Sequence, residues 1–269
     1  MQERGATDHI CRLSIREDGL EEQTEVQDLV LWKIAQSSVG FLVNVPTEGG
    51  KGAYIPAGSG VICRLPGEVI VVLTAAHVAK HVMEHSWAAM YGIPNPNPNN
   101  RPVEFLTRLA DVISYGGEDG ATGPDIAVLK PPPDQAARMA GSRVVYDIQT
   151  RINNPPTRPL PDLALVGLPS TAFSKLIEVN GDVRRDEYTL MVVSGARSSP
   201  KIDSNGFDSF EFMPQHVSGL RPSTYQGVSG GGVWSFDADN PAELPRLSGI
   251  AYYQSDEDAA GEDGAGDVC

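Results

Sequence analysis

The feature that most constrains the fold of this chain is a series of short runs rich in Val, Ile, Tyr and Phe, separated by clusters of Gly, Pro and Asn. Such runs are typical of β-strands, and the clusters are typical of turns. Long amphipathic helical segments do not alternate with these runs, which argues against an α/β fold. We therefore predict an all-β barrel or sandwich. The predicted strands are 39–45, 58–64, 68–73, 103–106, 126–129, 163–167, 188–193, 210–213, 232–236 and 247–253.

The predicted strands lie between residues 38 and 254, and this region is expected to form one domain with two halves. The proline-rich stretch at 155–161 is the best candidate for the connector, so the halves span about 38–150 and 160–254. Residues 1–37 form a separate N-terminal extension. Its alternating residues 9–16 predict a strand, and the capping-box spacing from Thr24 to Gln27 predicts a short helix.

The charge of the chain excludes some classes of partner. It has 35 acidic and 21 basic residues and a formal net charge of −14, so it lacks the excess of Lys and Arg that phosphate binding requires. We expect no nucleic-acid partner and no membrane partner. Residues 255–269 carry six of the acidic residues and no Lys or Arg, and we expect this acidic tail to be flexible or dependent on a partner.

Cysteine content and the N-terminal residues favour a reducing compartment. Cys11, Cys63 and Cys269 cannot form a disulfide framework, and the first ten residues lack the apolar region of a secretory signal. The longest apolar stretch, 69–78, is too short to cross a membrane. We expect a cytoplasmic protein.

Three segments carry residue types that can perform nucleophilic catalysis together. His77 follows a buried apolar strand, Asp125 precedes another, and Ser229 lies in the glycine loop 227–232. Each has an ordinary structural explanation alone, as a core histidine, a turn aspartate or a hairpin loop. Together they supply a nucleophile in Ser229, a general base in His77 and an orienting acid in Asp125. The backbone N–H groups of Gly227 and Ser229 would form the oxyanion hole.

The order of these residues in the chain distinguishes two folds. Residues 227–231 match the G-x-S-x-G nucleophile elbow of α/β-hydrolases, in which the histidine follows the serine. No histidine follows Ser229 here, so this assignment fails. The order His, Asp, Ser is that of chymotrypsin-like enzymes.

With these motifs in place, the sequence resembles the trypsin/chymotrypsin-like serine peptidases. The segment TAAHV at 74–78 is similar to the TAAHC motif of this family. The segment DIAVLK at 125–130 is similar to DIALL and closer still to the motif of the HtrA-like branch. The segment GVSGGGV at 227–233 is similar to GDSGGPV. The resemblance implies a double barrel of two six-stranded antiparallel β-barrels and a serine endopeptidase that cleaves polypeptides without a cofactor. Residues 58–62 and 247–253 also resemble family strands.

The chain departs from the family at three positions, one of which affects activation. Val78 stands where a cysteine usually follows the histidine, and Ala57 stands where its partner is expected, so that disulfide is absent. Val228 replaces the aspartate that pairs with a new N-terminus in secreted members. We therefore expect a regulatory protein partner or a ligand to control activity, as the HtrA-like resemblance also implies.

Substrate contacts are also inferred from the resemblance. Ser223, six residues before the nucleophile, would line the floor of the specificity pocket, and a neutral floor favours a small or apolar side chain over Lys or Arg. Tyr252, Tyr253 and Gln254 would form the strand edge that pairs with the substrate, although they could equally be ordinary barrel residues.

The family normally has a closing strand after the position of Gln254, where this chain has only the acidic tail. The C-terminal barrel could therefore be incomplete, and its open edge would be a template for pairing. The strand predicted at 9–16 or a partner chain could cover that edge.

Other functions remain open from the residues alone. His77, His81 and His85 have a helical spacing that could bind zinc, but Val78 stands where the metalloprotease motif needs glutamate, so we expect no metal site. A catalytically silent module that binds extended peptides or partner proteins is the main alternative, because loop geometry decides whether an oxyanion hole forms. An esterase with the same triad is a third possibility.

Overall fold

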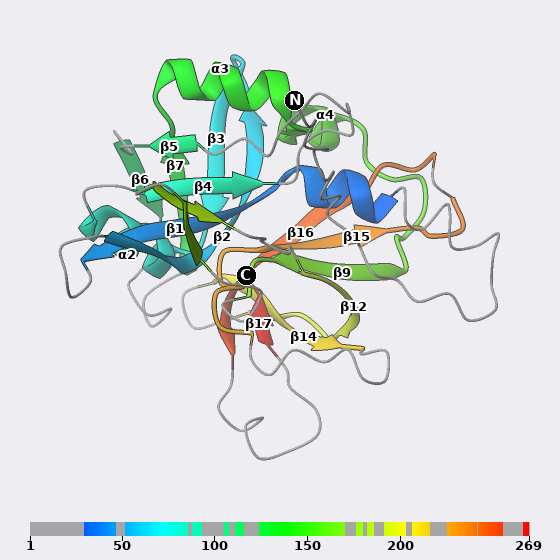
Figure 1. The fold of residues 1–269 in the computed structure, drawn as a ribbon. Coiled ribbons are helices and arrows are strands. Elements are labelled where there is room, and N and C mark those ends of the chain that lie inside the picture. The colour runs from blue at the N-terminus through cyan, green and yellow to red at the C-terminus, as the bar shows by residue number, and fades with distance from the viewer. Residues whose placement is uncertain are drawn as a thin grey trace, which may run out of the picture.

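The computed structural model describes residues 30–46, 52–85, 88–92, 105–107, 111–115, 124–169, 176–179, 182–185, 191–202, 206–215, 225–240, 242–254 and 266–268. These residues form a mostly β structure with two large sheets lying side by side and few helices (Figure 1). The predicted strand at 9–16 and the capping box at 24–27 lie outside the described residues, and residues 30–36 are helical.

The first sheet contains eight strands and includes the segments around His77 and Asp125. Its order is β5 (Phe105–Thr107), β4 (Ala88–Gly92), β1 (Ser38–Pro46), β2 (Gly52–Leu65), β3 (Val69–Thr74), β7 (Ile126–Lys130) and β6 (Asp111–Tyr115), with β8 (Tyr146–Asp147) paired to β2. All of these pairs are antiparallel except β2 with β8. Between the described residues no pairing joins β5 to β6, so the sheet is open.

The second sheet contains seven strands and curls back on itself. Its order is β12 (Met191–Arg197), β9 (Asp162–Gly167), β15 (Gly232–Phe236), β16 (Arg246–Gln254), β17 (Gly266–Val268), β14 (Asp208–Pro214) and β13 (Lys201–Ile202). β14 also pairs with β12, which curls this antiparallel sheet into a barrel-like half. β10 (Leu176–Val179) and β11 (Asp182–Arg185) form a separate pair.

The structure corrects the expectation of an open edge after Gln254. Strand β17, in the acidic tail, lies between β16 and β14 and pairs antiparallel with both. The sequence did not predict it because Gly266 and Asp267 have low strand propensity, and the pairing partners on both sides override that preference. Three residues of the expected flexible tail are thus part of the second sheet.

Besides residues 30–36, the described part of the chain has three helices that lie between strands: α2 (Ala76–Glu84), α3 (Pro133–Ser142) and α4 (Ile148–Asn153). The helical spacing of His77, His81 and His85 agrees with α2, but the sequence predicted neither α3 nor α4. Pro133 begins α3. A proline fits this position because the first N–H of a helix has no partner within the helix, so the Pro131–Pro133 run marks a helix start as well as a turn. The predicted connector at 155–161 follows α4 and leads into β9. Among the described helices, none has the length and apolar character needed to cross a membrane.

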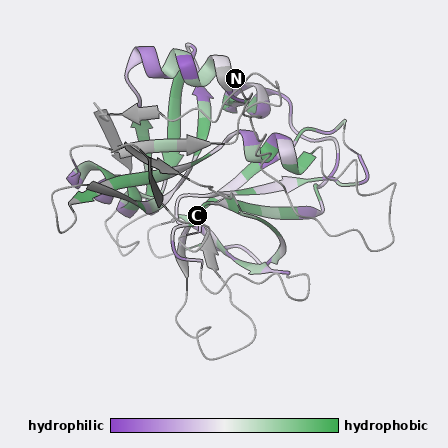
Figure 2. Cartoon of the chain, in the orientation of Figure 1, coloured by the Kyte–Doolittle hydropathy of each residue, from purple (hydrophilic) through white to green (hydrophobic). Residues whose placement is uncertain are grey.

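Strands β2 and β9 have several apolar residues in a row because both of their faces are buried. Along β9, Leu163 and Leu165 point into the second sheet, whereas Ala164 and Val166 join a cluster between the sheets. β2 shows the same alternation, since Ile62 packs inside the first sheet and Val61 and Cys63 face the shared cluster. Figure 2 shows hydrophobic residues concentrated on these strands. The shared cluster joins the two halves through a common core.

Candidate active site

His77 lies at the start of α2, where the chain leaves the buried strand β3. The residue before the helix, Ala75, has no side chain that can cap the first N–H groups. Asp125 does so instead: its backbone oxygen accepts from Ala76 N–H at 3.1 Å, and its Oδ1 accepts from His77 N–H at 3.0 Å. One residue therefore fixes the start of the helix and the position of the histidine.

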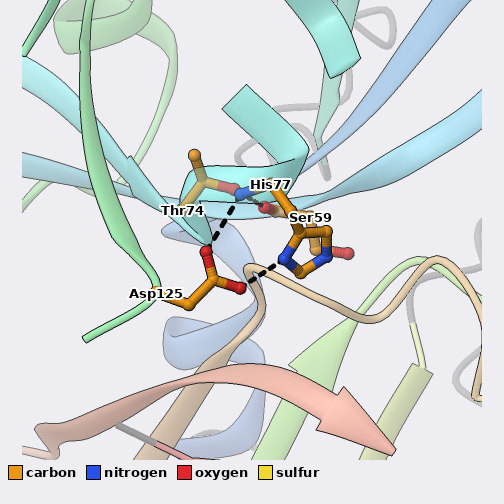
Figure 3. A network of polar contacts seen from close by, with 4 residues as sticks. All are labelled: Ser59, Thr74, His77 and Asp125. Carbon is orange, nitrogen blue, oxygen red and sulfur yellow. Dashed lines mark hydrogen bonds and ion pairs between the residues drawn. The ribbon is translucent and has the colours of Figure 1, made fainter. Parts of the chain in front are cut away.

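The other carboxylate oxygen of Asp125 contacts the imidazole ring (Figure 3). Oδ2 lies against His77 Nδ1, and the Asp125 residue is only 2% exposed. A carboxylate can only accept, so Nδ1 carries the proton and Nε2 is left as the basic nitrogen. The His77 side chain is 40% exposed, which leaves the ring accessible to a substrate. This is the arrangement that orients a general base.

Ser229 lies in a compact loop, residues 225–231, which we call the nucleophile loop. The backbone N–H groups of Val228 and Gly231 donate to Tyr225 and Val228 carbonyls at 3.0 and 2.8 Å. Gly227 and Gly230 have φ values of +91° and +85°, in the left-handed region that favours glycine. The backbone conformation of the loop thus favours glycine at positions 227 and 230.

The nucleophile loop docks onto the first sheet next to His77. Ser59 N–H on β2 donates to the Ser229 carbonyl at 2.7 Å. A Cβ on Gly230 would overlap the Thr74 hydroxyl and the Ser59 carbonyl oxygen, which shows how closely the loop approaches the end of β3. Because His77 follows Thr74 by three residues, the structure brings the histidine, aspartate and serine segments together. Between the described residues, no hydrogen bond joins the Ser229 hydroxyl to His77.

The two N–H groups predicted to form the oxyanion hole differ from neighbouring N–H groups of the loop in their hydrogen bonding. Val228, Gly230 and Gly231 donate to the backbone carbonyls of Tyr225, Ala251 and Val228. Within the described part of the chain, the N–H groups of Gly227 and Ser229 have no backbone acceptor.

The predicted substrate contacts are placed only in part. Ser223 lies outside the described residues. Tyr252 is partly buried against the core of the first sheet. Tyr253 and Gln254 lie on β16 opposite Asp267 and Gly266 of β17, so one edge of this segment is occupied by the chain itself. The pairing of β16 with β15 ends at Ile250, before this segment.

The three residues that depart from the peptidase motifs are apolar and packed. Val78 is buried in the core of the first sheet, and Ala57 packs against the same cluster. Val228 is 3% exposed and belongs to the cluster inside the second sheet. Apolar contacts thus surround all three side chains.

His81 lies in the last turn of α2, and His85 directly follows the helix. The His81 and His85 rings pack edge to face, and His85 Nδ1 donates to the His81 carbonyl at 2.9 Å. His81 Nδ1 lies 3.8 Å from a Glu84 oxygen. Over the described ranges, no group of three or more His, Cys, Asp or Glu side chains is arranged to hold a metal ion.

Sequence reasoning missed Ser59, which the structure places at the centre of the contacts between loop and sheet. Its hydroxyl bonds both to Gly227 and to Leu168, and its carbonyl accepts from the Thr74 hydroxyl at 2.6 Å. The available signal was the Gly-Ser-Gly run at 58–60, in which a serine stands between two glycines on an otherwise apolar strand.

Comparison with known proteins adds no family assignment. No protein-family model matches the chain, and no match was found among curated proteins.

Proposed function

We propose that the protein is a serine endopeptidase of the chymotrypsin-like type, in which the two halves are the two barrels of that fold. The observation that carries the proposal is the contact of His77 Nδ1 with Asp125 Oδ2 at the point where the nucleophile loop docks. The curled second sheet supports the barrel assignment for that half, because β14 returns to pair with β12.

In the proposed mechanism, His77 Nε2 takes the proton of the Ser229 hydroxyl as Oγ attacks the scissile carbonyl carbon. Asp125 holds the ring and stabilises the imidazolium that forms. The oxyanion is stabilised by the N–H groups of Gly227 and Ser229. The imidazolium then protonates the leaving amine, an acyl-enzyme forms, and water attacks it with His77 acting again as the base.

Control of this activity is proposed to come from a protein partner or a ligand in the cytoplasm. The buried Val228 supports this proposal, because an apolar side chain in the core of the second sheet offers no carboxylate to a new N-terminus. The proposed substrates are polypeptides with a small or apolar residue before the cleaved bond. A peptide-library cleavage profile tests this preference, and preferred cleavage after Lys or Arg would contradict it.

Covalent labelling tests the proposed function. A fluorophosphonate is expected to modify the wild-type chain at Ser229, as located by mass spectrometry of peptides, and to leave Ser229→Ala unmodified. Ser199→Ala, which removes an exposed serine away from the site, is the matched control and should label like wild type. A modified serine other than Ser229 would contradict the assignment.

The alternative is a catalytically silent module that binds extended peptides. One observation favours it: the Ser229 hydroxyl makes no hydrogen bond to His77 between the described residues. Such bonds often form only when substrate is bound, so this does not exclude catalysis. Absence of labelling under all conditions, including with candidate partners, together with measurable peptide binding, would establish the silent module.

A further inference from the structure

The Ser59 hydroxyl makes two hydrogen bonds that cross between the two halves of the molecule. Ser59 lies on β2 of the first sheet and is fully buried. Its Oγ donates to the Gly227 carbonyl at 2.9 Å and accepts from Leu168 N–H at 2.7 Å. Both partners belong to the second half, one in the nucleophile loop and one just after β9.

The direction of these hydrogen bonds is fully determined. A backbone N–H can only donate and a carbonyl can only accept, so the single hydroxyl proton must point to Gly227. The hydroxyl is enclosed closely, since a Cβ on Gly167 would lie 3.1 Å from Ser59 Oγ and 2.7 Å from Val228 Cγ1. Water therefore has little room to replace it.

The peptide unit that Ser59 holds lies between the two oxyanion donors. Gly227 contributes the carbonyl of this unit, which bonds to Ser59, and Val228 contributes its N–H, which bonds to the Tyr225 carbonyl. The N–H groups of Gly227 and Ser229 belong to the peptide units on either side. Because Gly227 permits a wide range of backbone angles, removing one anchor frees this unit to rotate.

We propose that Ser59 is a positioning residue that presets the oxyanion hole through its bond to the Gly227 carbonyl. Its backbone contributes to the same task, because Ser59 N–H holds the Ser229 carbonyl and the Ser59 carbonyl accepts from Thr74 Oγ1. Ser59 thus sets the loop relative to the segment that carries His77. This inference rests on the proposed function.

The test compares Ser59→Ala with Ser38→Ala. Ser38 is a matched control, because it is fully buried on a neighbouring strand and its hydroxyl donates to the Ile34 carbonyl at 3.2 Å, away from the loop. Peptide hydrolysis and inhibition by a peptidyl boronic acid are measured. Ser59→Ala should lower kcat about 10- to 100-fold, less than the loss of a whole oxyanion donor, with KM within about twofold. Affinity for the boronic acid should fall by the same factor.

A purely structural role gives a different result. If Ser59→Ala and Ser38→Ala have the same kcat, or if only KM changes, the proposal is overturned. Should Ser59→Ala fail to fold, Ser59→Cys retains a weaker donor at the same place and should show a smaller loss of kcat. Wild-type kcat in Ser59→Cys would then overturn the proposal.

Hydrogen exchange separates this inference from the proposed function. If the wild-type chain is neither labelled at Ser229 nor active, the proposed function fails while the anchoring by Ser59 can still be measured. The Leu168 amide should exchange at least about tenfold faster in Ser59→Ala than in Ser38→Ala, because its acceptor is lost. Equal exchange in the two variants would show that the hydroxyl does not hold this segment.

Discussion

The two halves of the molecule position their parts of the site by different means. In the first half, side-chain contacts place His77, because Asp125 binds both the ring and the backbone of that residue. In the second half, backbone hydrogen bonds and left-handed glycines place Ser229. Substitution of Asp125 should therefore change the chemistry of the histidine, whereas substitutions in the nucleophile loop should act through loop geometry.

The largest expected effect comes from the first half, where the Asp125 side chain places His77. In Asp125→Asn an amide N–H₂ would face His77 Nδ1 and favour the wrong tautomer. We therefore expect kcat to fall by about 10⁴ while the fold is retained, as it does for the same change in the chymotrypsin triad. Steady-state kinetics and circular dichroism check this. Asp111→Asn is the control, because Asp111 is another aspartate in this stretch of the chain and lies at the start of β6, opposite Lys130 at the far end of β7 from Asp125. A greater loss in Asp111→Asn would show that the acid is misassigned.

A pair of glycine substitutions tests how the backbone of the nucleophile loop places Ser229. Gly230→Ala places a Cβ against the Ser59 carbonyl and the Thr74 hydroxyl at a φ of +85°. It should displace the loop and lower kcat by about 10²–10³, the loss expected when an oxyanion donor is removed. Gly67→Ala has a similar φ of +79° but open space around the new Cβ. It should cost only the left-handed backbone strain of about 1–2 kcal/mol and leave kcat unchanged.

Comparing the two variants separates the effect of backbone strain, which both share, from the effect of steric overlap, which only Gly230→Ala has. Chemical unfolding gives the stability of each variant, and peptide hydrolysis gives kcat. Equal kcat in Gly230→Ala and Gly67→Ala would contradict the close docking of the nucleophile loop.

The sequence predicted most strands of both halves from short apolar runs, among them β2, β3 and β7 in the first half and β9, β15 and β16 in the second. The pairing of His77 with Asp125 was expected from their residue types and from the resemblance to serine peptidases, and the two side chains are in contact. β4 (Ala88–Gly92) was missed because Ala and Gly have low strand propensity. Ser59 and β17 were missed because their roles depend on partners more than 100 residues away or on two flanking strands, which a local pattern does not encode.

The curl of the second half is tested by a proline in β17. Asp267 lies opposite Glu211 of β14 and Tyr253 of β16, and a proline cannot occupy a strand paired on both sides. Asp267→Pro should therefore lower Tm by several degrees, measured by calorimetry. Asp267→Ala removes the same side chain but keeps the backbone N–H, so it should lower Tm less. The same decrease in both variants would argue against a specific role for the β17 pairing.

The smallest expected effect lies in the first half, at the start of α4. The backbone N–H of Thr150 bonds to Asp147 and lowers the pKa of that carboxyl below its usual value of 3.8. A lowered folded-state pKa stabilises the fold at pH values above 3.8, and this stabilisation is lost as the pH falls through the folded pKa. Asp147→Asn keeps a capping oxygen but removes the charge.

Thermal unfolding of wild type and Asp147→Asn checks this sign. The small advantage of the wild type at pH 7 should disappear below the folded pKa. An advantage that grows with acidification would contradict the assignment, and a change in kcat at pH 7 would show that α4 influences the site.

The most direct test of the active-site geometry is a crystal structure of the chain after reaction with a peptidyl phosphonate. We expect phosphorus bonded to Ser229 Oγ, one phosphonyl oxygen about 3 Å from the N–H groups of Gly227 and Ser229, and His77 held by Asp125 beside the adduct. A phosphonyl oxygen that faces away from both N–H groups, or an adduct on another residue, would contradict the proposed active site.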